Sequence, residues 1–170
     1  MKKLLSRIII LLIVVSPFLT SCLNSETSTD YTAEKEQQLL QEYLAGLVKN
    51  GYNVDTTSLG VYYVKITAGT GSFPVEGDTL SVKYVGYLMD GSVFDHSFYS
   101  SADSSWTYVH KVNKTLAAWE EMMGRMNKGT KMEFIVPSAL AYGATGASVV
   151  PPYSSLIFVA VMKDIKANKK

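Results

Sequence analysis

The chain has 170 residues and a mass of 18.7 kDa, a length that indicates one globular domain with short accessory segments. Its 16 basic and 15 acidic residues exclude the strongly basic surface typical of nucleic-acid-binding proteins. A single cysteine excludes a disulfide framework, so the stability of the fold must come from a packed core. With two histidines and no phosphate-binding glycine loop, the sequence lacks the usual parts of metal and nucleotide chemistry, and we expect no metal and no cofactor.

The N-terminus has the order of residues that is typical of a secretory signal. Three basic residues within the first seven precede an apolar run at 8–15. Ser16 and Pro17 interrupt this run well before the roughly 20 apolar residues that a membrane-spanning helix needs. We therefore expect residues 1–21 to be a signal peptide that is removed, which would leave 13 basic against 15 acidic residues.

The signal ends in Leu19-Thr20-Ser21-Cys22, which resembles the lipobox of bacterial lipoproteins. The resemblance implies cleavage before Cys22, diacylation of Cys22 and a lipid-anchored position in the bacterial cell envelope. Leu23 stands where many lipoproteins of the inner membrane have an acidic residue, which favours the periplasmic side of the outer membrane. The alternative is an ordinary secreted protein in which Cys22 is a lone thiol.

Residues 22–58 are expected to form a stalk and one helix ahead of a domain at 59–170. The stalk is rich in Asn, Ser, Thr and acidic side chains, which cannot bury enough apolar surface to order themselves. Thr32 is a predicted helix N-cap, and Asn50-Gly51 is a predicted stop. Between them apolar residues recur at helical spacing: Leu39, Leu40, Tyr43, Leu44 and Leu47. This helix of about four turns either packs on the domain or pairs with a second copy to form a homodimer, and its short length favours packing.

The first half of the domain reads as β-structure. A strand is expected at 59–66, and a second strand follows the turn at 74–78. The second strand alternates between an apolar face with Leu80, Val82, Tyr84 and Leu88 and a polar face with Thr79, Ser81 and Lys83. Asp90-Gly91 is a hairpin signal, so residues 93–95 should pair back on this strand.

The second half adds one helix, two strands and a long loop. A short helix is expected to open at Trp119 and to be stopped by Gly129. Strands are expected at 132–136 and 156–162, and the glycine- and proline-rich loop at 141–152 joins them. A loop of this length inside a compact domain is usually functional. Together these elements predict an α+β fold in which a curved antiparallel sheet wraps around one short helix.

Two motifs in this domain occur in a fixed order. The first runs from Gly77 to Gly86 and continues with Asp90-Gly91 and Phe94-Asp95. The second comprises Ala141-Tyr142-Gly143, Gly146, Val149-Val150-Pro151-Pro152 and Leu156-Ile157-Phe158. Together the two motifs resemble the FKBP-type peptidyl-prolyl cis/trans isomerases. The matches keep the order of that family and cover roughly the C-terminal two-thirds of the chain. The resemblance implies an isomerase that assists the folding of envelope proteins, acts on proline-containing polypeptides without a cofactor, and can bind the macrolide inhibitors of the family.

The resemblance also implies a substrate pocket and its residues. Trp119 matches the floor of the pocket, and Tyr142 matches a tyrosine whose hydroxyl binds the substrate. Asp95 matches the carboxylate beside the twisting carbonyl. Catalytic roles are thereby implied for Asp95 and Tyr142, and substrate binding for Tyr84, Phe94, Trp106, Thr115, Leu116, Trp119, Val149, Val150 and Phe158.

Three functions therefore remain open at the level of the sequence. Rotation about a prolyl bond needs no covalent step, so an isomerase is compatible with the lack of reactive groups. A catalytically weak chaperone or peptide-binding module would use the same apolar cleft. An interaction component of an envelope complex would use the helix at 33–49 instead.

Overall fold

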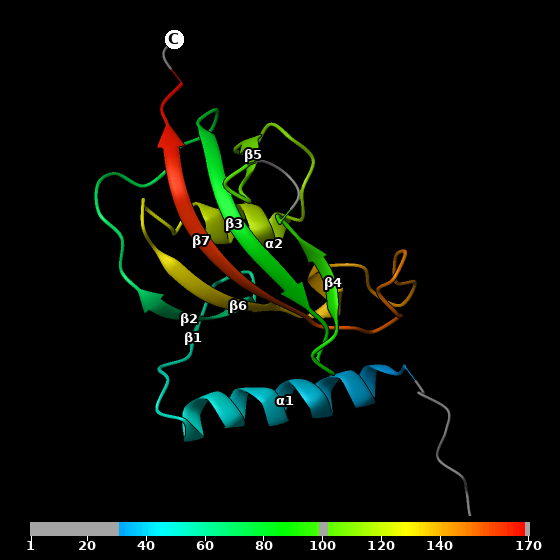
Figure 1. The fold of residues 1–170 in the computed structure, drawn as a ribbon. Coiled ribbons are helices and arrows are strands. Elements are labelled where there is room, and N and C mark those ends of the chain that lie inside the picture. Colours follow the sequence, from blue (N-terminus) through cyan, green and yellow to red (C-terminus); the bar gives the residue numbers. More distant parts are fainter. Residues whose placement is uncertain (1–30, 99–101, 169–170) are drawn as a thin grey trace, which may run out of the picture.

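The computed structural model of the chain describes residues 31–98 and 102–168 (Figure 1). The predicted signal peptide, most of the stalk and Cys22 lie outside this range. The elements, in chain order, are α1 (Ala33–Lys49), β1 (Asp55–Thr56), β2 (Tyr62–Thr67), β3 (Thr79–Tyr87), β4 (Val93–His96), β5 (Trp106–Val109), α2 (Ala117–Met123), β6 (Lys131–Val136), the 3₁₀ helix η1 (Ser138–Leu140) and β7 (Leu156–Lys166).

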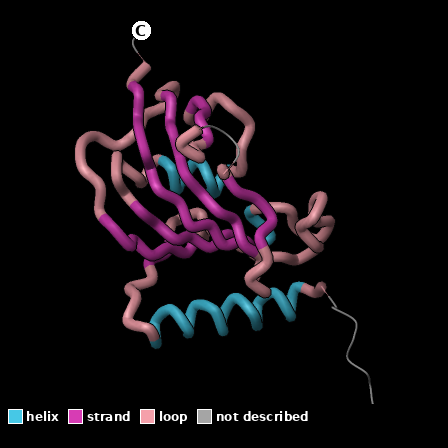
Figure 2. The backbone as a smooth tube through the Cα atoms, in the orientation of Figure 1, coloured by secondary structure: helices cyan, strands magenta, loops and turns pink. Residues whose placement is uncertain are grey.

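Seven antiparallel strands form one sheet in the order β1-β2-β6-β7-β3-β4, with β5 paired to the other part of β3. The long central pair is β3 with β7, in which Tyr84 faces Ala160 across the strands and Gly86 faces Phe158. Figures 1 and 2 show the sheet curving around α2, which lies on its concave side. The predicted fold, a curved antiparallel sheet around one short helix, is confirmed.

The alternation predicted for β3 is present. Leu80 and Val82 are fully buried in the main core, and Tyr84 packs at the edge of that core. Gly86 continues this face, and a Cβ atom there would lie 2.7 Å from the Phe94 ring and 3.2 Å from the Phe158 ring. A glycine is therefore needed at this position so that the Phe94 ring can reach Phe158.

The predicted helix at Trp119 is correct in its existence but wrong in its bounds. It begins at Ala117 and ends at Met123, because Gly124 caps it. Gly129 does not end the helix; its N–H donates to Met162 O of β7 at 2.8 Å. The sequence reading also missed β5 and placed the first strand of the domain too early, since Leu59 precedes β2.

The helix α1 begins and ends as predicted. The Thr32 side chain accepts a hydrogen bond from Lys35 N at 3.2 Å, and Asn50 caps the C-terminus. Its apolar stripe lies on the face of the sheet opposite α2, where Leu40 and Leu47 are buried against Val64, Ile135 and Ile157. The helix thus packs on its own domain, which is the first of the two alternatives. The homodimer through this helix stays a prediction.

Tyr43 adds a polar contact to this packing, because its hydroxyl donates to Glu133 Oε1 of β6 at 2.8 Å. Burial raises the pKa of Tyr43, and the hydrogen bond to Glu133 raises it further, so the hydroxyl remains a donor. Within the described ranges, no helix is long and apolar enough to cross a bilayer.

Candidate active site

A cavity of about 200 Å³ opens between the concave face of the sheet, α2 and the loop that joins β6 to β7. Strands β3, β4, β5 and β7 supply its walls, and α2 supplies its floor. Nine side chains line it: Tyr84, Phe94, Asp95, Trp106, Thr115, Leu116, Trp119, Tyr142 and Phe158. All nine are residues to which the sequence assigned a catalytic or substrate-binding role.

Aromatic rings in edge-to-face contact form the deep part of the cavity. The Trp119 ring is 4.9 Å from the Tyr84 ring and 5.3 Å from the Phe158 ring, centroid to centroid. The Phe94 ring meets the Phe158 ring at 5.5 Å, and Trp106 stacks on Tyr108 at 4.4 Å. Contacts of this kind fix the orientation of each ring. The result is a rigid apolar bowl that is open on one side.

A tyrosine and a carboxylate form the polar edge of the bowl. The Tyr84 hydroxyl donates to Asp95 Oδ2 at 2.8 Å, and His96 N donates to Asp95 Oδ1 at 2.8 Å. Burial raises the pKa of Tyr84, and the hydrogen bond to Asp95 and its negative charge raise it further. Tyr84 therefore stays protonated at neutral pH and holds the Asp95 carboxylate in a fixed orientation.

Tyr142 is the cavity residue that comes from the loop between β6 and β7. It follows η1 in the loop between β6 and β7 and keeps 37% of its surface exposed. Ala141 N and Gly143 N both donate to Ser138 O, at 2.9 and 2.8 Å, so the backbone on each side of Tyr142 is tied to one carbonyl. This places a hydroxyl donor at the mouth of the cavity, within the reach of a bound peptide.

Val149 and Val150 are not among the side chains that line the cavity, and their part in substrate binding stays a prediction. Ala147 N donates to Val150 O at 2.9 Å and Val150 N donates to Ala147 O at 2.8 Å, so the chain makes a tight turn. Val149 at the tip of this turn points outward and is 65% exposed, whereas Val150 is buried in the main core. The turn decides both orientations, and apolar character alone could not distinguish them.

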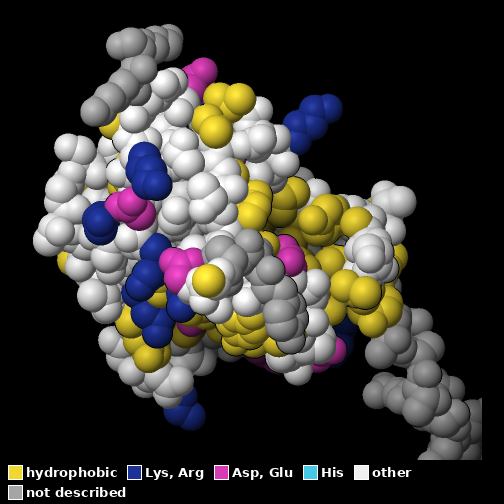
Figure 3. Space-filling model, turned by 45° about the horizontal axis from the view of Figure 1, so that its top comes forward, with side chains coloured by type: hydrophobic (Ala, Val, Ile, Leu, Met, Phe, Trp, Pro, Cys, Tyr) yellow, Lys and Arg dark blue, Asp and Glu magenta, His cyan; other side chains and the backbone are white. Residues whose placement is uncertain are grey.

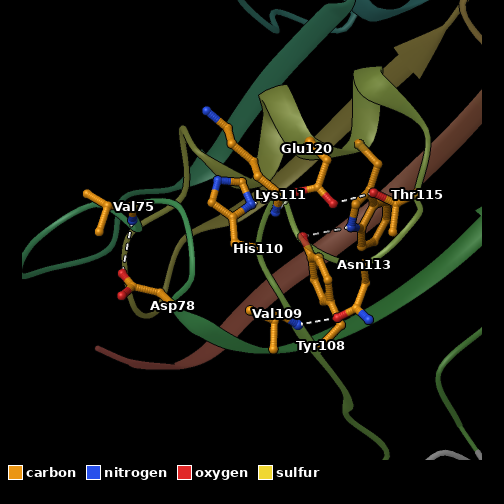
Figure 4. Close-up of polar contacts among 10 residues, drawn as sticks. Val75, Asp78, Tyr108, Val109, His110, Lys111, Asn113, Thr115 and Glu120 are labelled. Atoms are coloured by element: carbon orange, nitrogen blue, oxygen red, sulfur yellow. Dashed lines mark hydrogen bonds and ion pairs between the residues drawn. The ribbon is translucent and has the colours of Figure 1, made fainter. Parts of the chain in front are cut away.

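A polar network behind the cavity was missed by the sequence reading, and its centre is Glu120 of α2 (Figure 4). His110 Nδ1 lies 2.6 Å from Glu120 Oε2, so the buried imidazole and the carboxylate are in direct contact. Lys111 N donates to Glu120 Oε2 at 3.0 Å, and Thr115 Oγ1 donates to Glu120 Oε1. Glu120 therefore fixes the segment that carries Thr115 and Leu116 to the cavity wall.

The same network reaches the floor of the cavity. Trp119 Nε1 donates to the Tyr108 hydroxyl at 3.1 Å. Burial raises the pKa of Tyr108, and the nearby charge of Glu120 raises it further. The sequence signal for this network was the glutamate directly after Trp119, because a carboxylate in a short, largely buried helix needs hydrogen-bond donors nearby.

No group of three or more His, Cys, Asp or Glu side chains with the geometry of a metal site occurs in the part of the chain that the structure describes. The cavity is instead a shaped apolar surface with hydroxyl and carboxylate groups at its rim. Such a site can bind an apolar ring and orient a polar backbone group beside it. Its geometry contains no nucleophile paired with a base.

Comparison with known proteins assigns the chain that forms this cavity to a family. The model of the FKBP-type peptidyl-prolyl cis-trans isomerases matches residues 70–162, which include every residue of the cavity. The FKBP-type isomerase FkpA of Escherichia coli K12 is 34% identical over 117 residues, covering 69% of this chain and 42% of FkpA. Mip of Coxiella burnetii is 34% identical over 119 residues, covering 69% of this chain and 50% of Mip. The chain thus spans half or less of the length of these curated relatives.

Solved structures agree with this assignment. The crystal structure of FkpA from Escherichia coli superposes with a TM-score of 0.68 at 31% identity, covering 79% of this chain and 61% of FkpA. A peptidyl-prolyl cis-trans isomerase from Pseudomonas syringae pv. tomato superposes with a TM-score of 0.66 at 27% identity, covering 82% of this chain and 100% of that one. With its sheet, its cavity and the family match in agreement, the chain belongs to the FKBP-type peptidyl-prolyl cis-trans isomerase family.

Proposed function

We propose that the protein is a peptidyl-prolyl cis-trans isomerase that binds the ring of a substrate proline in the aromatic cavity. The observation that carries the proposal is the bowl formed by Trp119, Tyr84 and Phe158, whose rings pack edge to face around an open apolar space. Such a cavity suits prolyl isomerisation, a reaction in which no covalent bond is made or broken and only the partial double-bond character of the C–N bond is lost.

The barrier to rotation about the prolyl bond is about 18–20 kcal/mol and comes from amide resonance. The twisted amide has lost that resonance and is less polar than the planar one. An apolar cavity therefore stabilises the twisted form relative to water, and this difference is what accelerates rotation. In this arrangement Trp119 supports the pyrrolidine ring.

The polar rim holds the rest of the peptide. Tyr142 at the mouth donates a hydrogen bond to a substrate carbonyl, and the Asp95 carboxylate, oriented by Tyr84, lies beside the carbonyl that turns. The backbone N–H near Leu116, at the start of α2, holds a second carbonyl. Contacts on both sides of the rotating bond orient the peptide so that the bound geometry favours the twisted amide.

The direct test is the cis-to-trans rate of a short proline peptide with the full chain purified in detergent, with and without the macrolide tacrolimus. We expect acceleration that tacrolimus abolishes, because both ligands would occupy one cavity. A preparation that binds tacrolimus but leaves the rate at its uncatalysed value would overturn the isomerase and support a peptide-binding module.

A peptide-binding or chaperone role is the second candidate, and one observation favours it. Large apolar side chains are exposed in the segments of chain that carry cavity residues, among them Val93 at 51%, Phe98 at 52% and Val149 at 65%. Figure 3 shows hydrophobic side chains on the surface over the loop between β6 and β7. Such a surface suits apolar segments of unfolded polypeptides. Suppression of aggregation that persists after the cavity is blocked by tacrolimus would separate this role from catalysis.

We also propose that the protein is a lipoprotein of the bacterial cell envelope, anchored through Cys22 on the periplasmic side of the outer membrane. Its substrates would then be envelope proteins that are still folding. The Leu19-Thr20-Ser21-Cys22 motif supports the anchor, and Leu23 supports the outer membrane.

Replacement of Cys22 by Ala should abolish lipidation, because the thiol that accepts the diacylglycerol is removed. Mass spectrometry of the membrane fraction should show a processed, diacylated N-terminus in the wild-type protein and none in C22A. If the wild-type protein carries no lipid, and if it and C22A are both processed and recovered in the soluble fraction, the protein is instead an ordinary secreted chain.

A further inference from the structure

The first turn of α1 holds the loop that carries Tyr142. Glu36 accepts three hydrogen bonds there: from Ser138 N at 2.6 Å, from Ser138 Oγ at 2.5 Å and from Ser155 Oγ at 2.6 Å. Ser138 opens the loop after β6 and Ser155 closes it before β7. One carboxylate of the N-terminal helix therefore joins both ends of the loop. In Figure 1 the blue end of α1 lies beside this loop, which is drawn in orange.

The contact is buried on the loop side. Ser138 is 4% exposed and Ser155 is 1% exposed, so neither side chain can turn to bulk water. The Ser138 N–H donates to Glu36, and removing the carboxylate would leave this buried group without that acceptor. The Ser138 N–H and the hydroxyls of Ser138 and Ser155 all have this carboxylate as their acceptor.

The hydrogen bonds continue from Ser138 to the cavity. The Ser138 carbonyl accepts from Ala141 N and from Gly143 N, the two residues that flank Tyr142. Gly143 O in turn accepts from Tyr153 N at 2.9 Å, which ties the two sides of the loop together. Two successive steps thus lead from Glu36 to the backbone that sets the position of Tyr142.

We infer that Glu36 is a positioning residue of the active site, and that α1 acts through it to fix Tyr142 at the mouth of the cavity. The inference rests on the proposed function for its catalytic readout. It adds a role at the active site to the packing of the helix on its own domain. Glu36 itself does not line the cavity and acts through Ser138.

The variant E36A tests this inference, with Y43F as its matched control. Tyr43 also joins α1 to the sheet through a single side-chain hydrogen bond, but its partner Glu133 lies in β6 and not in the loop. We expect E36A to lower kcat/KM for a proline peptide by about tenfold, because displacing a positioning group by a fraction of an ångström to 1 Å has effects of this order. Y43F should stay within about twofold of the wild-type protein in the same full-length preparation.

A double-mutant cycle with Y142F distinguishes positioning from general support of the fold. If Glu36 acts through the Tyr142 hydroxyl, E36A should have little further effect in a protein that already lacks this hydroxyl. Independent effects of the two substitutions, multiplying to the full product, would overturn the inference. Should E36A fail to fold, S155A removes one of the three hydrogen bonds without altering the helix, and the same cycle is run with it.

A structural readout keeps the inference separate from the proposed function. Amide hydrogen exchange at Ala141 and Gly143 should be about tenfold faster in E36A and unchanged in Y43F, because opening of the loop is then less costly. This result is informative even if the wild-type protein catalyses no isomerisation, an outcome that would contradict the proposed function alone. Unchanged exchange at both amides in a folded E36A protein would overturn the positioning role.

Discussion

Replacement of Trp119 by Ala should lower kcat/KM for a proline peptide by about 100-fold or more, since the cavity loses the floor on which the substrate's proline ring is proposed to pack. Trp119 is 4% exposed and contacts the rings of Tyr84, Phe134 and Phe158. Its removal leaves a cavity in the core, and we expect the free energy of unfolding to fall by about 3–5 kcal/mol. Stopped-flow kinetics at low temperature measure the change in kcat/KM, and urea unfolding of the same preparation measures the change in stability.

The control for this variant is L80A. Leu80 is fully buried in the same core, but it does not line the cavity. Its truncation should cost about 2–5 kcal/mol of stability while kcat/KM of the folded fraction stays near the wild-type value. If L80A and W119A have similar free energies of unfolding and lose kcat/KM equally, Trp119 has no direct role in substrate binding. For a W119A protein too unstable to study, W119F with its smaller ring offers the same comparison.

Replacement of Glu120 by Ala should have the second large effect, on stability first and on binding as a result. The variant removes the partner of fully buried His110 and the acceptor for Lys111 N and Thr115 Oγ1. Each buried polar group that is left without its partner typically costs about 1–3 kcal/mol, so we expect the free energy of unfolding to fall by at least this amount. Urea unfolding measures this loss, and the KM of the peptide should rise because Thr115 is no longer held at the cavity wall.

An exposed ion pair supplies the contrast. Lys128 Nζ lies 2.7 Å from Asp164 Oδ1, and the Lys128 side chain is 62% exposed. Because water screens this pair, K128A should change the free energy of unfolding by less than about 1 kcal/mol. A small effect of E120A, comparable to that of K128A, would mean that the buried network does not hold the cavity wall. A large loss of stability in E120A with an unchanged KM would restrict its role to the core.

The two variants probe different parts of one site. In the proposed mechanism Trp119 touches the proline ring of the substrate. Glu120 contacts Thr115, and the Tyr108 hydroxyl accepts from Trp119 Nε1. We therefore expect W119A to lower activity even in the fully folded fraction. The effect of E120A should be concentrated in stability and substrate affinity.

The sequence by itself determined the features that depend on local pattern. The alternation of Leu80, Val82 and Tyr84 determined the register and the inner face of β3, because side chains of a strand point to opposite faces in turn. The spacing of Leu40 and Leu47 in the same way determined the buried stripe of α1. The resemblance to the family assigned roles to nine side chains that the structure brings together around the cavity.

Only the tertiary structure decided the polar partners and the shape of the loops. Glu36 meets Ser138 and Ser155 across 102 and 119 residues of sequence, and no local pattern specifies such a pairing. Val149 and Val150 are equal in apolarity, yet a tight turn sends one outward and the other into the core. A hydrogen bond needs a donor and an acceptor at a defined distance and angle, and packing of the whole chain sets that geometry. Hydrophobic periodicity is a property of each segment, whereas polar contacts between distant segments exist only after the fold has brought them together.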